Sequence, residues 1–156
     1  MSKAYNNALK SPDPSSQNGA VIVKRQENGT LDVVANGYNH FYRGIPGEVE
    51  DRAQKLREIE HAERDVIYAA GRRGIATEGS IMVCPWAACT ACSRALIQAG
   101  ISKLVRLPQN DAILNPRWED DGKIADKMLK EAGIEIEDLD IHAGVVLRMG
   151  GKEIEF

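Results

Sequence analysis

Aromatic residues are scarce in this sequence of 156 residues, where they make up 5% of the chain. Proteins that hold single-stranded nucleic acid stack the bases on aromatic rings, so this composition argues against such a platform. An excess of positive charge is missing as well, because the formal net charge is −3. Phosphate backbones favour basic proteins, so we expect no nucleic-acid partner.

Long apolar runs are also absent. No segment approaches the ~20 apolar residues that a membrane-spanning helix needs. The first residues, MSKAYNNALKSPDPSS, contain no apolar signal core. We therefore expect neither export nor membrane insertion, and we place the protein in the cytoplasm, or in the host cytoplasm if the source is a virus.

Cysteine is rare, and its three positions are Cys84, Cys89 and Cys92. An odd number of cysteines, with two of them only three positions apart, does not form an ordinary framework of structural disulfides. In a reducing cytoplasm the close pair indicates metal ligands or a redox pair instead.

The remaining composition, 43% hydrophobic and 28% charged, is that of a globular protein. This length favours one domain over residues 1–156, large enough to bury a core. A short helix is expected over Lys3–Lys10. GAVIVKRQ and LDVVANGY, separated by the turn signal ENGT, predict two antiparallel strands. EDRAQKLREIE can be helical, and a further helix is expected from about Glu60 to Arg72.

The second half of the chain alternates between strand-like and helix-like segments. SIMVC, SKLVRL and IEIEDL predict strands, while CTACSRALIQAG and PRWEDDGKIADKMLKEAG predict helices between them. In the second of these helices we expect Ile124, Met128 and Leu129 to face inward. VVLRMGGKEIEF predicts a final hairpin around Gly150 and Gly151. This order implies a three-layer α/β/α sandwich with a mixed, mostly parallel five-stranded sheet and helices on both faces.

The close pair, Cys89 and Cys92, lies at the start of a predicted helix, so both side chains fall on one face. Such a CxxC pair has several interpretations: zinc ligands, a redox pair, or two small buried residues. The redox interpretation is weakened because the pair comes late in the chain, after two strands and a helix.

His61 and Glu63 are two positions apart, where a helix would point them about 200° away from each other. At the first turn of a helix, however, side chains splay around the end of the axis. His61 can then bind a metal while Glu63 reaches a water on it. Together with Cys89 and Cys92, His61 gives three ligands, and the open fourth position is typical of a catalytic zinc.

These residues resemble those of the zinc-dependent cytidine and deoxycytidylate deaminases. The resemblance rests first on HAE, which begins at His61, and on the CxxC pair. Further segments resemble deoxycytidylate deaminases in the same order: DPSSQNGAVIV, GYNHFYRG, CSRALIQAGI and RWEDDGKIADKMLKEAGI. The resemblance covers about Asp13 to Ile134.

The resemblance implies a zinc ion held by His61, Cys89 and Cys92, with Glu63 as the proton shuttle. The function it implies is hydrolytic deamination of dCMP to dUMP and ammonia, in pyrimidine deoxynucleotide metabolism. Its partners would be a small-molecule deoxynucleotide substrate and the allosteric nucleotides dCTP and dTTP. It also implies a homo-oligomer, which is a hexamer in many dCMP deaminases.

For the substrate, the resemblance places Asn39 at a sugar hydroxyl and the backbone of Ala62 against the base. His40 and Arg43, which follow Asn39, are further candidates for substrate contact. The phosphate would need a cation, and the candidates for it are Arg43, Lys24, Arg25 and Arg117. We interpret Cys84 as a small buried residue and Trp118 as a packing anchor.

Two departures from the family pattern leave alternatives open. Ala88 stands where a proline usually precedes the first cysteine, and Tyr42 replaces the proline of a GxPxG loop. A deaminase that also or mainly uses dCTP, or a CMP or cytidine deaminase, fits the altered loop. A tRNA adenosine deaminase would need a basic face. Outside this class, the alternatives are a nucleotide-sensing module that retains zinc, and a thiol–disulfide oxidoreductase.

Overall fold

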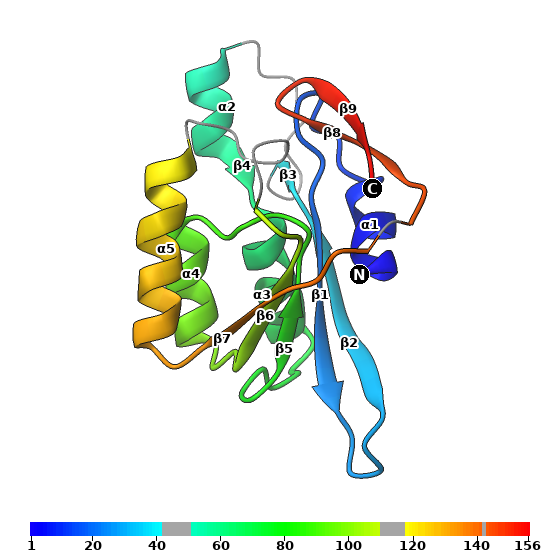
Figure 1. Cartoon of the computed structure of the whole chain (residues 1–156), viewed down its shortest axis with the longest axis vertical. Coiled ribbons are helices and arrows are strands. Elements are labelled where there is room, and N and C mark those ends of the chain that lie inside the picture. The colour runs from blue at the N-terminus through cyan, green and yellow to red at the C-terminus, as the bar shows by residue number, and fades with distance from the viewer. Residues whose placement is uncertain (42–50, 110–117, 142) are drawn as a thin grey trace.

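The computed structural model describes residues 1–41, 51–109, 118–141 and 143–156. Its centre is a five-stranded sheet in the order β2-β1-β5-β6-β7 (Figure 1). The strands are β1 (Gly19–Arg25), β2 (Leu31–Tyr38), β5 (Ile81–Val83), β6 (Lys103–Arg106) and β7 (Glu135–Asp138). β1 pairs antiparallel with both β2 and β5, and β5, β6 and β7 are parallel.

Three helices cover one face of this sheet: α3 (Ala62–Arg72), α4 (Thr90–Gln98) and α5 (Glu119–Glu131) (Figure 1). Their apolar sides and that face form the main core. Its fully buried members include Ile22, Met82 and Leu104 from strands and Val66, Leu96 and Leu129 from helices. This core fixes where α3 and α4 begin at the edge of the sheet.

The opposite face carries α1 (Ser2–Ala8), which contacts β1 and β2 (Figure 1). A hairpin of β8 (Val146–Met149) and β9 (Lys152–Glu155) lies beyond α1 and is hydrogen-bonded to the segment before β1. A second apolar cluster joins Tyr5 of α1 to Leu147 and Phe156 of the C-terminal segment. The sheet is thus enclosed between two layers, and the predicted three-layer α/β/α architecture is confirmed.

Two glycines allow helices to approach the sheet closely. A Cβ atom on Gly19 would lie 2.2 Å from the carbonyl oxygen of Ala4, and one on Gly37 would lie 2.6 Å from the backbone nitrogen of Val66. Any side chain at these positions would clash with backbone atoms. The start of β1 and the end of β2 are therefore pressed against α1 and α3.

A smaller unit lies beside the sheet: β3 (His40–Phe41), α2 (Arg52–Glu58) and β4 (Ile59–Glu60). Asp51 caps α2, because its carboxylate accepts a 2.8 Å hydrogen bond from the backbone N–H of Gln54. The short pairing of β3 with β4 joins His40 to Glu60. Glu60 is thus extended, and the helix predicted from about Glu60 begins at Ala62 instead.

The prediction for Ile124 was wrong, since 56% of this residue is exposed. In α5 the buried positions are Ala125 and Leu129, one turn apart. The helix, which packs against α4, is thus rotated so that Ala125 is buried instead of Ile124. The hairpin around Gly150 and Gly151 is confirmed, and both glycines have positive φ. Within the described ranges, no helix has the length and apolar character needed to span a bilayer.

Candidate metal centre and active site

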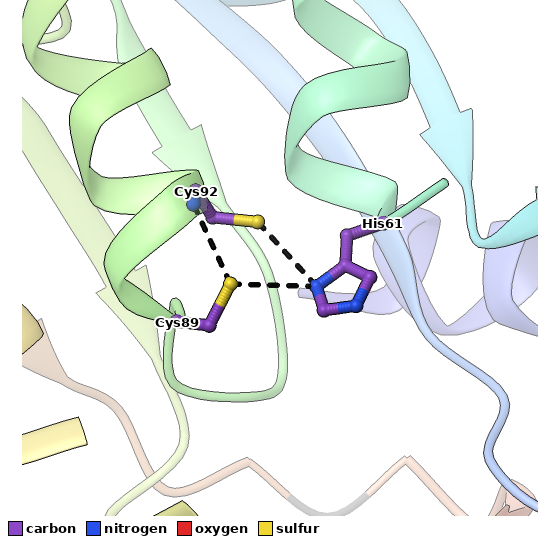
Figure 2. Close-up of side chains that lie close together, drawn as sticks. All are labelled: His61, Cys89 and Cys92. Carbon is purple, nitrogen blue, oxygen red and sulfur yellow. Dashed lines mark hydrogen bonds between the residues drawn. The ribbon is translucent and has the colours of Figure 1, made fainter. Parts of the chain in front are cut away.

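The candidate metal centre lies where two helices begin. His61 is the N-cap of α3 and Cys89 is the N-cap of α4, both with extended backbone. Cys92 follows in the first turn of α4, and its backbone N–H donates to Cys89 Sγ. Figure 2 shows the side chains of His61, Cys89 and Cys92 converging from the two helices. The structure therefore brings together the three residues predicted to be ligands.

The spacing of these side chains fits a zinc ion. His61 Nδ1 lies 3.6 Å from Cys89 Sγ and 3.5 Å from Cys92 Sγ, and all three ligand atoms lie within 4.8 Å of one another. Zinc–sulfur and zinc–nitrogen bonds of ~2.3 and ~2.05 Å at a tetrahedral angle would separate nitrogen from sulfur by ~3.6 Å. The group thus has the donor types and the spacing of a zinc site, with Nδ1 as the histidine ligand.

The pKa values of the three side chains are shifted by their close contacts, and that of Cys89 is shifted in the direction that suits a bound cation. A hydrogen bond with the Cys92 thiol, aided by His61, lowers the pKa of Cys89 to about 4. The same hydrogen bond, with burial, raises the pKa of Cys92. The hydrogen bond with Cys89 raises the pKa of His61. Cys89 is thus favoured as the thiolate, which is the form in which cysteine binds a metal ion.

Glu63 lies next to this centre but outside the group of three ligands. It is 2% exposed, and burial raises the pKa of its carboxyl, although the charge of His61 opposes this effect. A carboxyl group with a raised pKa beside a metal site is suited to proton transfer near neutral pH. Glu63 is thus in the position that a proton shuttle would need.

A cavity of about 680 Å³ opens over the centre. His61, Glu63 and Cys89 line it, together with residues of the turn before β1 and of the helix α2. Such a volume suits a small-molecule ligand. The metal centre and the carboxylate are therefore accessible to a molecule in the cavity.

Asn39 also lines this cavity, and its side chain is already partly engaged. Its Nδ2 donates to the carbonyl oxygen of Ser16 at 2.7 Å, and its Oδ1 accepts from the backbone N–H of Asn18 at 2.6 Å. An amide oxygen has two lone pairs, so Oδ1 can accept one further hydrogen bond. The structure thus places Asn39 in the same cavity as Glu63 and His61.

Lys55 of α2 is a lining residue that the sequence prediction missed. Its ammonium group lies 2.5 Å from Asp13 Oδ1 and 2.6 Å from Ser15 Oγ, and all three residues line the cavity. The side chain of Lys55 is 13% exposed. A cation held in this way can meet an anionic group that enters the cavity.

The other predicted substrate residues are placed differently. His40 is not among the described lining residues, and its Nε2 lies 3.0 Å from Asp65 Oδ1. Ala62 is fully buried between the lining residues His61 and Glu63. Arg43 lies outside the described residues, so its predicted role stays a prediction.

Among the phosphate candidates, Arg117 also falls outside the described residues. Arg25 ends β1, while Gly19 begins it beside the cavity, so at ~3.3 Å per residue about 20 Å of strand separates the two. Lys24 is its neighbour in the same strand. Both cations are thus too far from the metal centre to meet a ligand in the cavity.

Trp118 was predicted to be a packing anchor, and that prediction was wrong. The residue is 42% exposed and lines the cavity, and its ring centroid lies 6.5 Å from that of His61 in an edge-on arrangement. Asp121, one turn further along α5, accepts hydrogen bonds of 2.9 Å from the backbone and the hydroxyl of Thr90. The start of α5 is therefore tied to the start of α4, beside the metal centre.

Residues 1–107 match the family model described as the cytidine and deoxycytidylate deaminase zinc-binding region. An uncharacterized deaminase in the luxG 3′ region of Aliivibrio fischeri is 31% identical over 128 residues, which are 81% of each chain. The deoxycytidylate deaminase of Enterobacteria phage T2 is 37% identical over 76 residues, 49% of this chain and 36% of that protein. This match thus covers about a third of the phage protein.

The fold is similar to that of a dCMP deaminase from the cyanophage S-TIM5 in its apo form. The TM-score is 0.68 at 22% identity, and the match covers 89% of this chain and 93% of that one. The same enzyme in complex with dCMP and dUMP gives a TM-score of 0.67. At this level of identity the likeness establishes a common fold.

Proposed function

Because the chain belongs to the cytidine and deoxycytidylate deaminase family, we propose that it is a zinc-dependent hydrolase that converts dCMP to dUMP and ammonia. The observation that carries this proposal is the convergence of His61, Cys89 and Cys92 beside the buried Glu63, next to one cavity. Three ligands leave a tetrahedral position open, as in catalytic rather than structural zinc sites.

In this proposal His61, Cys89 and Cys92 hold the zinc ion. When bound, zinc would lower the pKa of a water toward ~7, so that hydroxide is available at neutral pH. Glu63 accepts the proton of the attacking water and donates it to the ring nitrogen of the cytosine. The water oxygen bonds to C4 in this step. Glu63 then takes the second proton, from the new C4 hydroxyl, and delivers it to the exocyclic amino group, so that the C4–N bond breaks, ammonia leaves and the C4 carbonyl forms.

The nucleotide substrate is supported by the polar groups around the cavity. Asn39 has hydrogen-bonding capacity left for a sugar hydroxyl. Lys55, which lines the same cavity, offers a cation for the 5′-phosphate. The phage T2 relative carries the name deoxycytidylate deaminase, and the S-TIM5 enzyme has been crystallised with dCMP and dUMP.

Ammonia release from dCMP, deoxycytidine, CMP, dCTP and adenosine substrates tests this function. A site built around a phosphate leaves its cation unpaired when a nucleoside binds. We expect kcat/KM for dCMP to exceed that for deoxycytidine by more than ~10²-fold, about 2.7 kcal/mol of transition-state binding. Equal turnover of the two would identify a nucleoside deaminase. Bound zinc without ammonia release from any substrate would identify a nucleotide-sensing module.

We further propose that the protein forms a homohexamer, is located in the cytoplasm and is regulated by dCTP and dTTP. Exposed apolar side chains near the cavity support assembly: Leu56 is 46% exposed and Trp118 is 42% exposed. Light scattering tests the assembly, and the mass of a single chain would contradict it. Steady-state competition between dCMP and dCTP distinguishes a second substrate from a regulator.

A further inference from the structure

Asn18 lies at the point where the cavity, the sheet and Glu63 meet. It directly precedes β1 and lines the cavity. Its side-chain Nδ2 lies 3.4 Å from Glu63 Oε2 and 3.3 Å from Cys84 Sγ. Among the residues that the structure describes, no other side chain donates a hydrogen bond to the Glu63 carboxylate. Asn18 is therefore the polar side chain best placed to orient it.

The direction of the Asn18 amide is set by its surroundings. Its Oδ1 accepts a 2.9 Å hydrogen bond from the backbone N–H of Gly19, and Cys84 Sγ lies 3.4 Å from the same oxygen. A backbone N–H can only donate, so the oxygen has to face Gly19. The NH2 group must then face Glu63, where it can only donate to the carboxylate.

The backbone of Asn18 is held as firmly as its side chain. Its N–H donates to Asn39 Oδ1 at 2.6 Å, and its carbonyl oxygen accepts from the N–H of Asn39 at 3.0 Å. The next residue, Gly19, is pressed against α1, because a Cβ there would lie 2.2 Å from the carbonyl oxygen of Ala4. Asn18 thus cannot shift without disturbing both α1 and Asn39.

We propose that Asn18 is a positioning residue, whose NH2 group holds Oε2 of Glu63 and leaves the other carboxylate oxygen to exchange protons during deamination. This inference rests on the proposed function, because it assigns Glu63 a proton-transfer role. A glutamate side chain has three rotatable bonds, and misplacing a catalytic group by an ångström can cost a large factor in rate. A fixed donor removes that freedom.

The variant that tests this is Asn18→Leu, which resembles asparagine in shape but cannot donate a hydrogen bond. We expect kcat for dCMP to fall about tenfold, as for loss of one hydrogen bond to a charged group. The KM for dCMP and the Kd for dUMP should change less than about threefold, and zinc per chain should not change. If the leucine variant does not fold, Asn18→Ala provides the same comparison.

Asn7→Leu is the matched control. Asn7 is a buried asparagine of α1, and its Nδ2 donates to the carbonyl oxygen of Ala20 and to Asn36. Its substitution should lower stability while leaving kcat per zinc-loaded molecule unchanged. An equal fall of kcat in both variants would overturn the proposal, as would a rise in KM without a fall in kcat for Asn18→Leu.

Two further measurements isolate the link to Glu63. In a Glu63→Gln background, Asn18→Leu should change the remaining rate less than twofold, because the group through which it acts is gone; an undiminished tenfold effect would refute the link. Crystal structures of the zinc-loaded parent and of Asn18→Leu should show one carboxylate position in the parent and a displaced one in the variant. An unmoved carboxylate would overturn the inference even if dCMP proved not to be the substrate.

Discussion

Nδ1 of His61 and Sγ of Cys92 lie 3.5 Å apart, although they are separated by 31 positions in the chain. The contact exists because α3 and α4 pack on the same face of the sheet and begin at the same edge. His61 and Cys89 are the N-caps of the two helices and have extended backbones, and Cys92 lies in the first turn of α4. The metal centre is therefore a product of the core, and it should respond to changes in either helix.

Replacing a ligand should remove the metal. We expect about one zinc ion per chain in protein purified without added zinc, and loss of both metal and activity in Cys89→Ala. The variant should also be less stable, because the free energy of metal binding is also free energy of folding. Metal analysis and thermal unfolding measure the two effects.

Cys84→Ala is the control for that experiment, since Cys84 is a fully buried cysteine outside the group of ligands. It should keep its zinc. An active Cys89→Ala protein without metal would contradict the assignment of the centre.

Glu63→Gln should separate proton transfer from metal binding. Glutamine preserves the shape of the side chain but cannot accept the proton of water. Turnover of dCMP should fall at least ~10²-fold, the low end for general acid–base catalysis. Zinc content should stay at the parental level, and a variant that loses its zinc would show that Glu63 acts as a ligand.

The sequence predicted the metal centre well because its chemistry is encoded locally. His61 with Glu63, and Cys89 with Cys92, are short motifs whose spacing is meaningful at the start of a helix. Lys55 could not be found in this way. It lies in a charged run that a solvated helix would also have, and its partner Asp13 is 42 positions away. Only the docking of α2 against the turn before β1 makes Lys55 part of the cavity.

The sheet and the order of elements were equally predictable. Strand patterns alternate with helix patterns that end at glycines, and few sheet topologies are compatible with that order. The orientation of α5 was not predictable. Ile124 and Ala125 are adjacent, and a pattern of apolar residues cannot tell which of them is buried. The rotation of a helix on its neighbours depends on the packing of the whole folded chain, which the local pattern does not contain.

Asn39→Ala should reduce turnover of every nucleotide substrate without affecting zinc. The change removes the group proposed to bind the sugar, along with the hydrogen bonds to Ser16 and Asn18. Because these are buried, a loss of about 1–3 kcal/mol in unfolding free energy should accompany it. Kinetics with dCMP, dCTP and deoxycytidine measure the first effect and chemical denaturation the second. If the variant turns over any of these substrates as fast as the parent protein does, Asn39 does not contact the sugar.

Lys55→Met should impair turnover of the nucleotide dCMP but not of the nucleoside deoxycytidine. Methionine fills the space of the lysine stem but carries no charge, so the phosphate loses its cation while the metal centre is unchanged. We expect kcat/KM for dCMP to fall by ~10²-fold, comparable with the discrimination against deoxycytidine. The value for deoxycytidine itself should change less than about threefold. Lys24→Met is the matched control, because Lys24 lies toward the far end of β1, and it should leave both values as they are. If Lys24→Met lowers the value for dCMP and Lys55→Met does not, the phosphate is held from another side of the molecule, and the role of Lys55 is limited to its ion pair with Asp13.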